Sequence, residues 1–235
     1  METQELHFMY LVVHELRTPL SAIKSSADLL SFYKEMDDRH TILQIGEHIG
    51  RIQTEAEKLN RMLDGLLLLA KIEAGKIKQN QKPADILSVV NNTISAQNAM
   101  QSDGRNSSLS ITGLPVKIIF EEEQLERILD NLLSNAFKYS GGNPPPELQV
   151  HFTGSSVRII VKDFGIGIPE DEQHLVHNSF FRASNAENAD GIGLGLVIVR
   201  RLVNLNGGDM QFTSIENEGS EFTISFPYPE GNAYP

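Results

Sequence analysis

Apolar residues recur at alternating steps of three and four along the first third of the chain. One series runs from Leu6 to Leu30 and a second from Ile45 to Ala70. Such spacing is typical of long helices whose apolar stripe packs against other helices. The polar segment 34–41 separates the two series, so the pattern predicts a helical hairpin. One hairpin buries only one stripe per helix, and we therefore expect a homodimer whose two hairpins form a four-helix bundle.

The pattern changes beyond Ala74. Segment 75–83 (GKIKQNQKP) contains a helix-ending glycine and a proline, and predicts a linker. After it, helical patterns are present at 84–100, 122–140 and 194–206, and strand patterns at 116–120, 148–152, 157–163, 209–214 and 220–227. Helices combined with mostly antiparallel strands predict a two-layer α/β sandwich. The expected domains are the hairpin at 1–76, a hinge at 77–84, the sandwich at 85–229 and a tail at 230–235.

Composition and charge narrow the possible partners. The 235 residues carry a formal net charge of −11, which argues against nucleic acid or an anionic membrane as the main partner. The chain has no cysteine, which excludes disulfides, thiolate metal sites and cysteine nucleophiles. No apolar run approaches the roughly 20 residues of a membrane-spanning helix, and the N-terminus lacks a signal-peptide pattern. We expect a cytoplasmic location without membrane contact, and a first helix that continues upstream in a longer chain.

The predicted helix 122–140 carries a narrow polar stripe. Asn131, Asn135 and Lys138 are spaced at i, i+4 and i+7, so they share a stripe roughly 60° wide, opposite the apolar side of the helix. Amide oxygens can ligate Mg²⁺, and an ammonium group can neutralise phosphate. A solvated helix face is the ordinary alternative for such a stripe.

Two glycine-rich motifs follow. In DFGIGIP (163–169) the glycines allow close backbone approach to a ligand, and Asp163 can accept a hydrogen bond from an amino group. An ordinary glycine turn is the alternative. The second motif, DGIGLGLVIV (190–199), opens a helix, and backbone N–H groups at a helix N-terminus attract phosphate. It has neither the leading strand of a dinucleotide-binding motif nor the lysine of a P-loop.

The order and spacing of these motifs resemble the ATP-binding domain of sensor histidine kinases. That fold is shared with DNA gyrase, heat-shock chaperone and mismatch-repair ATPases. The closing segment 218–227 (EGSEFTISFP) is similar to the last glycine box and final strand of the same family. The resemblance implies a Bergerat-type sandwich that binds ATP and Mg²⁺.

The resemblance also implies roles for individual residues. On helix 122–140 these are Asn135 and Asn131 as magnesium ligands, Lys138 as a phosphate contact and Tyr139 near the nucleotide. In the glycine motifs they are Asp163 for the adenine amino group, Gly165 and Gly167 in the adenine-side turn, and Gly191, Gly193, Gly195 and Leu196 around the lid and the phosphates. Phe180 and Arg182 would belong to an aromatic box before the lid, which spans roughly residues 183–190. The chain departs from the family pattern at His177, Ile192 and Asn217, where phenylalanine, threonine or serine, and glycine are usual.

The string HELRTPL (14–20) lies within the first predicted helix. His14 directly follows an apolar stripe position, and Thr18 lies one turn further on the same face. Pro19 removes an N–H and leaves the carbonyl of Glu15 without its helical partner, so a bend is expected. A lone histidine is more often structural, but this string matches the phospho-acceptor box of histidine kinases, with Val13 where serine is common.

This match implies the reaction. His14 would take the γ-phosphoryl group of ATP, Glu15 would act as its general base, and Thr18 would be linked to dephosphorylation of the partner. Arg17 would help hold the phosphoryl group or the docking surface. The phosphoryl group would then pass to an aspartate of a response-regulator receiver domain. Two alternatives stay open: a degenerate kinase that acts as a dimeric scaffold, and an ATPase of the same fold without phosphohistidine.

Overall fold

The computed structural model describes residues 2–33, 39–77, 82–142, 144–186 and 193–228. The chain divides into two compact units, Met1–Ala70 and Lys71–Pro235, and each is described by itself. Within the described ranges, no helix combines the length and the apolar character that crossing a membrane requires.

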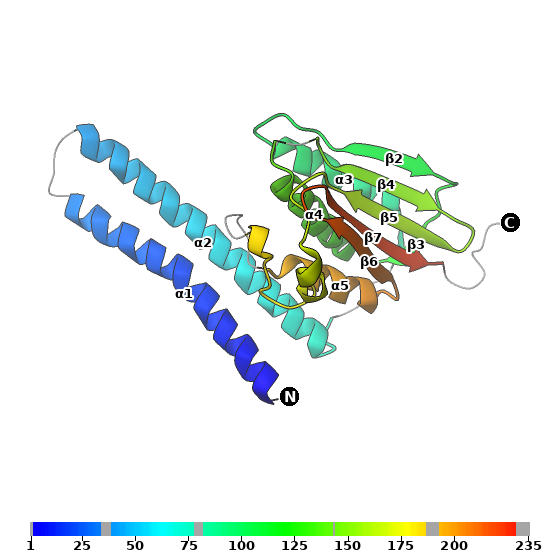
Figure 1. Cartoon of the computed structure of the whole chain (residues 1–235), viewed down its shortest axis with the longest axis horizontal. Helices are drawn as coiled ribbons and strands as arrows, with labels where there is room; N and C mark the ends of the chain where they lie inside the picture. Colours follow the sequence, from blue (N-terminus) through cyan, green and yellow to red (C-terminus); the bar gives the residue numbers. More distant parts are fainter. Residues whose placement is uncertain (1, 34–38, 78–81, 143, 187–192, 229–235) are drawn as a thin grey trace. The chain divides into compact units, whose positions relative to one another are not determined.

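The first unit is the predicted helical hairpin. Helix α1 covers Glu2–Tyr33 and α2 covers Arg39–Glu73 (Figure 1). The ring of Tyr33 in α1 lies 5.8 Å from that of His48 in α2, which ties the two helices together near the connection. The predicted turn 34–41 is too long at its C-terminal side, because α2 already begins at Arg39. Residues 34–38 of that turn lie outside the described residues.

Much of the predicted apolar stripe remains exposed in the single chain. On α1, Leu6, Val13 and Leu20 are 76%, 50% and 59% exposed, and on α2, Leu63 is 46% exposed. Apolar surface of this extent is typical of an interaction face. One hairpin therefore does not close its own core.

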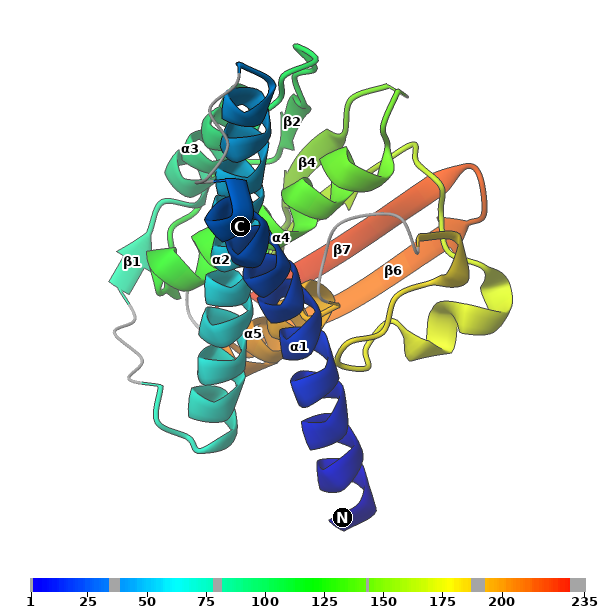
Figure 2. The same cartoon turned by 90° about the vertical axis from the view of Figure 1, so that its left-hand side faces the viewer.

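The second unit is the predicted two-layer sandwich. Its five-stranded sheet has the order β2-β4-β5-β7-β6. The strands are β2 (Ser108–Thr112), β4 (Glu147–Phe152), β5 (Ser156–Lys162), β6 (Asp209–Ile215) and β7 (Gly219–Pro227). Only the pairing of β2 with β4 is parallel among these neighbours. The last hairpin, β6 and β7, is seen along its length in Figure 2.

Three helices form the other layer on one face of this sheet (Figure 1). They are α3 (Ile86–Ala99), α4 (Glu122–Tyr139) and α5 (Gly195–Leu205). Alternate residues of β4, β5 and β7 are buried, and so are the apolar residues of α4, including Leu125, Leu129 and Leu133. Burial of this apolar face fixes the rotation of α4, so that its asparagine stripe points away from the core.

Two strands were not predicted. β1 (Lys82–Ala84) pairs antiparallel with β3 (Ile118–Phe120), so the end of the predicted linker belongs to a small second sheet. β2 is an exposed edge strand that carries serine or threonine at alternate positions. Strands of this kind lack the apolar alternation by which strands are usually predicted, and tertiary pairing decides them.

Candidate functional site

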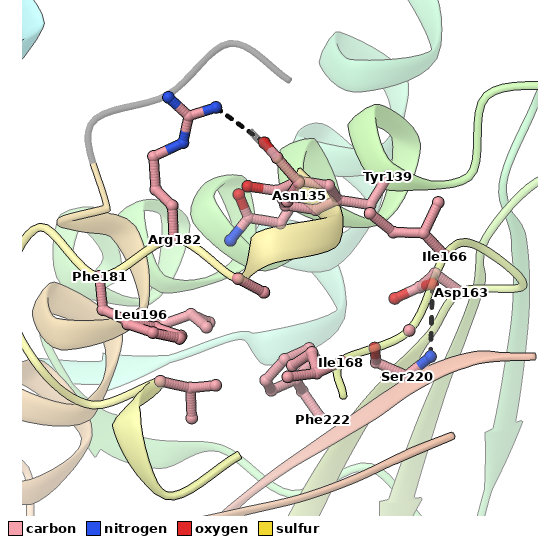
Figure 3. A pocket seen from close by; sticks show the side chains of 14 residues that line it. Asn135, Tyr139, Asp163, Ile166, Ile168, Phe181, Arg182, Leu196, Ser220 and Phe222 are labelled. Atoms are coloured by element: carbon pink, nitrogen blue, oxygen red, sulfur yellow. Dashed lines mark hydrogen bonds between the residues drawn. The ribbon is translucent and has the colours of Figure 1, made fainter. Parts of the chain in front are cut away.

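A pocket in the second unit gathers residues from five separated segments. They are Asn135 and Tyr139 of α4, Asp163, Ile166, Gly167 and Ile168 of the glycine turn, Val176, Phe181, Arg182, Ala183 and Ala186 between that turn and α5, Leu196 of α5, and Ser220 and Phe222 of β7. Figure 3 shows Asp163 and Ser220 on one side of the pocket, opposite Phe181 and Leu196. The structure thus brings to one pocket six of the thirteen cofactor-binding residues predicted for this unit: Asn135, Tyr139, Asp163, Gly167, Arg182 and Leu196.

Asp163 is the only buried carboxylate among the described residues, with 5% of its surface exposed. Its Oδ1 accepts hydrogen bonds from the backbone N–H of Gly165 at 2.9 Å and of Ser220 at 3.3 Å. Burial raises the pKa of Asp163, and these two backbone donors oppose part of that rise. Because both donors contact Oδ1, Oδ2 is left for a donor on a ligand.

The two glycines of the turn are required by close packing. A Cβ on Gly165 would overlap the backbone carbonyl of Tyr139 at the end of α4. Gly167 has φ +61°, and a Cβ there would overlap the carbonyl of Ile215. The turn is therefore held between α4 and the β6–β7 hairpin, where a side chain does not fit.

The asparagine stripe of α4 borders the pocket. Asn135 lines it, whereas Asn131 and Lys138 are not among the lining residues. Asn131 donates from Nδ2 to the carbonyl of Arg127 at 2.7 Å, so its Oδ1 points outward, toward the start of α5 at Gly195. An amide oxygen placed in this way suits a hard cation such as Mg²⁺.

Lys138 and Tyr139 interact with each other at the end of α4. The Nζ of Lys138 donates to the Tyr139 hydroxyl at 2.8 Å and lies 4.2 Å from the centre of that ring. Burial raises the pKa of Tyr139. The tyrosine is thus a neutral wall of the pocket, and the lysine places positive charge beside it.

The aromatic box differs in detail from the prediction. Phe181 lines the pocket and Phe180 does not. Phe180 has a left-handed φ of +66°, and its N–H donates to the carbonyl of Gly193 at 3.0 Å. Arg182 lines the pocket and donates from Nη2 to the carbonyl of Ala186 at 2.7 Å. The predicted positions Gly191 and Ile192 lie outside the described residues.

The first unit carries the HELRTPL string on α1. The side chain of His14 is 60% exposed, and its Nδ1 lies 3.3 Å from Oε1 of Glu15. The ring of Tyr10, one turn earlier, is stacked at a centroid distance of 6.3 Å. A proton on Nδ1, shared with Glu15, leaves the imidazole lone pair on Nε2. Arg17 and Thr18 are exposed on the same helix, and the helix continues through Pro19.

Comparison with known families settles what these two units are. Residues 4–75 match the family model described as "His Kinase A (phospho-acceptor) domain". Residues 120–230 match the model described as "Histidine kinase-, DNA gyrase B-, and HSP90-like ATPase". The chain belongs to the sensor histidine kinase family.

Curated relatives agree with this membership over nearly the whole chain. Sensor histidine kinase WalK of Bacillus subtilis is 29% identical over 236 residues, covering 98% of this chain and 38% of that protein. Sensor-like histidine kinase SenX3 of Mycolicibacterium smegmatis is 28% identical, covering 100% of this chain and 60% of that protein. The chain therefore spans less than two thirds of the length of these relatives.

Solved structures share the fold. Histidine kinase AdeS of Acinetobacter baumannii has a TM-score of 0.71 at 20% identity, covering 92% of this chain and 98% of that one. Histidine kinase ThkA, solved in complex with response regulator protein TrrA, has a TM-score of 0.72 at 18% identity, covering 95% of this chain and 61% of that one. These matches confirm the predicted architecture of a helical hairpin followed by an α/β sandwich.

Eight of the fourteen residues that line the pocket were not predicted from the sequence. The missed residues are Ile166, Ile168, Val176, Phe181, Ala183, Ala186, Ser220 and Phe222. Most are apolar and come from loops without a periodic pattern. The motif DFGIGIP (163–169) and the closing segment 218–227 contained a signal, since Ile166 and Ile168 lie within the first and Ser220 and Phe222 within the second.

Two of the departures from the family pattern are accommodated by the structure. Asn217 replaces a glycine and has a left-handed φ of +63°, a conformation that asparagine tolerates better than most residues. Its N–H donates to the carbonyl of Ile166 at 2.8 Å. The ring of His177 packs edge-on against Phe212 at 5.7 Å, in the place of an aromatic residue.

Replacing His177 with phenylalanine should reduce the loss of stability in mild acid. Burial lowers the pKa of His177, and the positive charge of Arg200 adds to this effect. The unfolded chain therefore binds a proton at a higher pH than the folded chain, so the free energy of unfolding falls as pH drops below about 6.5. Urea unfolding at pH 7.5 and 5.5 should show a smaller difference for His177→Phe than for the wild type. His174→Gln is the matched control on the neighbouring exposed turn, and an equal effect of both variants would contradict the assignment.

Proposed function

We propose that this chain is an ATP-dependent protein-histidine kinase that phosphorylates its own His14 and passes the phosphoryl group to an aspartate of a response regulator. One observation carries the proposal: an exposed histidine in the HELRTPL string occurs in the same chain as a pocket built around a buried Asp163. The first feature supplies an acceptor and the second a site for a nucleotide base. Neither feature alone would imply phosphoryl transfer.

Asp163 and the glycine turn bind the adenine. Oδ2 of Asp163 accepts a hydrogen bond from the adenine amino group, while Oδ1 stays bound to the backbone of Gly165 and Ser220. Ile166, Ile168 and Phe222 provide apolar surface for the flat base. This combination of apolar walls and one polar group is typical of small-molecule sites.

Asn135 and Asn131 hold the metal in this proposal, because the oxygen of Asn131 is already turned outward from its helix. Bound Mg²⁺ would neutralise and orient the phosphates of ATP. Lys138 adds positive charge beside the phosphates. Gly195 and Leu196 form the start of α5 beneath them, and Gly193 lies just before it, where backbone N–H groups attract anions. Gly191 belongs to the same motif by sequence.

His14 is the nucleophile. The lone pair on Nε2 attacks the γ-phosphorus, the bond to the bridging oxygen breaks, and ADP leaves with that electron pair. The proton on Nδ1 passes to Glu15, whose carboxylate lies 3.3 Å away. Thr18 and Arg17 lie exposed beyond His14, where a docked receiver domain would reach them, and the proposal includes dephosphorylation of that partner through Thr18.

Catalysis requires the two units to meet, and segment 77–84 is the proposed hinge between a phosphotransfer domain at 1–76 and a catalytic domain at 85–229. Within that segment, Lys82–Ala84 form β1, which is paired with β3 in the catalytic domain. A C-terminal tail at 230–235 completes the proposed division.

The proposed partners are supported by the exposed apolar surface of the hairpin and by a related solved structure. The exposed apolar stripe of α1 and α2 supports a homodimer through a four-helix bundle. Histidine kinase ThkA is solved in complex with response regulator protein TrrA, which supports a receiver domain as the second partner. The dependence on ATP supports a cytoplasmic location. The alternative of a degenerate scaffold is not favoured by Asn217 or His177, because the fold accommodates both.

Incubation with γ-labelled ATP and Mg²⁺ should label the protein itself. A phosphoramidate is expected to be lost in acid and kept in alkali, because protonation of the ring nitrogen makes it a good leaving group. ATP labelled at the α-phosphate is the control and should leave no label. A label stable in acid would exclude phosphohistidine, and the absence of label despite nucleotide binding would favour the scaffold.

A further inference from the structure

The glycine turn at Ile166–Ile168 is held by hydrogen bonds to residues of several other segments. The N–H of Ile166 donates to the carbonyl of Tyr139 at 3.2 Å. The N–H of Ile168 donates to Oγ of Ser214 at 2.9 Å. The carbonyl of Ile168 accepts from Nε2 of Gln173 at 3.1 Å. Backbone N–H and C=O groups that are shielded from water need hydrogen-bond partners within the protein. These bonds supply such partners and fix the position of the turn.

Asn185 supplies two further bonds to this turn. Its Nδ2 donates to the carbonyl of Ile166 at 3.2 Å and to the carbonyl of Gly167 at 3.1 Å. Ile166 also receives the N–H of Asn217, but for Gly167 the described residues show Asn185 as the donor to its carbonyl. Loss of Asn185 would therefore leave the Gly167 carbonyl without this bond.

Asn185 belongs to the segment 180–186, which we call the lid stem. One further bond holds the stem to a neighbouring segment, and another orders it internally. Oε2 of Glu172 accepts the N–H of Ser184 at 2.9 Å, and Nη2 of Arg182 donates to the carbonyl of Ala186 at 2.7 Å. Both Arg182 and Ala186 line the pocket. The stem and the glycine turn are thus two walls of one pocket, and Asn185 links them from outside it.

We propose that Asn185 is a positioning residue for nucleotide binding, which couples the lid stem to the turn that contacts the base. The proposal rests on the proposed function, because it assumes that the pocket binds adenine against this turn. Asn185 does not line the pocket, so it acts on the ligand only through the backbone of Ile166 and Gly167. A ligand that holds the turn in place also favours the present position of the stem, and the reverse is equally true.

The test compares Asn185→Asp and Asn185→Ala with the wild type in the full chain. Asn185→Ala loses the donor, and the dissociation constant for Mg·ATP should rise about five-fold, which corresponds to about 1 kcal/mol. Asn185→Asp keeps the shape of the side chain but places a carboxylate against two carbonyl oxygens. This variant should raise the dissociation constant for Mg·ATP at least about ten-fold. Ser184→Ala is the matched control, since among the described residues Ser184 is bonded through its backbone N–H, and this variant should bind ATP as the wild type does.

Adenosine distinguishes a role at the base from a role at the phosphates. The coupling acts through the turn that contacts the base. Competition with a fluorescent nucleotide should therefore show that the variants lose affinity for adenosine by the same factor as for ATP. The KM for ATP should rise with little change in kcat, and the unfolding temperature without ligand should stay close to that of Ser184→Ala.

Three results would overturn the proposal. The first is that Asn185→Asp binds ATP with wild-type affinity, and the second is that the variants lose affinity for ATP but not for adenosine. The third is that the loss of affinity is accompanied by a matching fall in unfolding temperature. Nucleotide binding also separates this proposal from the kinase assignment. If the wild-type chain binds ATP but forms no phosphohistidine, the kinase assignment is refuted. The Asn185 variants would still test the positioning role, because that test needs only nucleotide binding. A wild-type chain that binds neither ATP nor adenosine would refute both.

Discussion

Replacing His14 with glutamine should abolish the phosphoryl label on the protein while leaving its affinity for ATP unchanged. Glutamine keeps polar atoms at this exposed position of α1 but has no lone pair of comparable nucleophilicity. Loss of a nucleophile typically removes nearly all of the chemical step, so we expect at least about a 10³-fold fall in labelling rate. Binding is unaffected because every residue that lines the pocket belongs to the second unit.

The matched control is His48→Gln, which alters a histidine on the other helix of the same hairpin. His48 contacts the ring of Tyr33 and has no part in the proposed chemistry, so its variant should label at the wild-type rate. The measurement is the initial rate of label incorporation from γ-labelled ATP, with bound nucleotide measured in parallel by calorimetry. An undiminished rate in His14→Gln would show that another residue accepts the phosphoryl group.

Replacing Asp163 with asparagine should weaken ATP binding by about 10- to 100-fold, the effect expected when a charge-assisted hydrogen bond is lost. The backbone N–H groups of Gly165 and Ser220 will keep an oxygen of the new amide at the Oδ1 position. Its NH₂ then takes the Oδ2 position and faces the adenine amino group, donor against donor. The substitution therefore replaces an attraction by a repulsion without a change of shape.

Calorimetry with Mg·ATP and Mg·GTP would measure this effect. Guanine presents a carbonyl oxygen where adenine has its amino group, and the asparagine NH₂ can donate to it. We therefore expect the preference for ATP over GTP to fall in Asp163→Asn. The fold should survive, because burial already disfavours the charged carboxylate and the variant removes that charge. Unchanged ATP binding in a folded variant would place the base elsewhere.

Much of the fold was predictable because its signals are local. The three–four spacing on α1 and α2 arises from helix geometry itself, and α4 at Glu122–Tyr139 ends one residue before the end of the predicted range 122–140. Strands β4, β5 and β7 alternate apolar and polar residues because one face of each is buried. β1 and β2 were missed because a short or exposed strand depends on its partner for its hydrogen bonds, and the pairing partner is remote in the sequence.

The site likewise contains residues that local motifs predicted and residues that only the folded chain reveals. Asp163, Gly165, Gly167 and Asn135 were predicted from motifs, and the structure brings Asp163, Gly167 and Asn135 to one pocket, with Gly165 donating to Asp163. Phe181 rather than Phe180 faces that pocket, because Phe180 takes a left-handed backbone conformation and bonds to Gly193. A one-residue shift of this kind follows from backbone torsion, which the sequence pattern does not report.

By itself the sequence determined the helices, the central strands, the acceptor string and the motif that holds Asp163, because each depends on residues within a few turns of one another. Only the tertiary structure decided which loop residues complete the pocket, that the oxygen of Asn131 lies against the start of α5 at Gly195, and that Asn185 bonds to the glycine turn eighteen residues earlier. Those features depend on where distant backbone segments come to rest. Their positions follow from burial of the whole apolar layer and not from any local pattern.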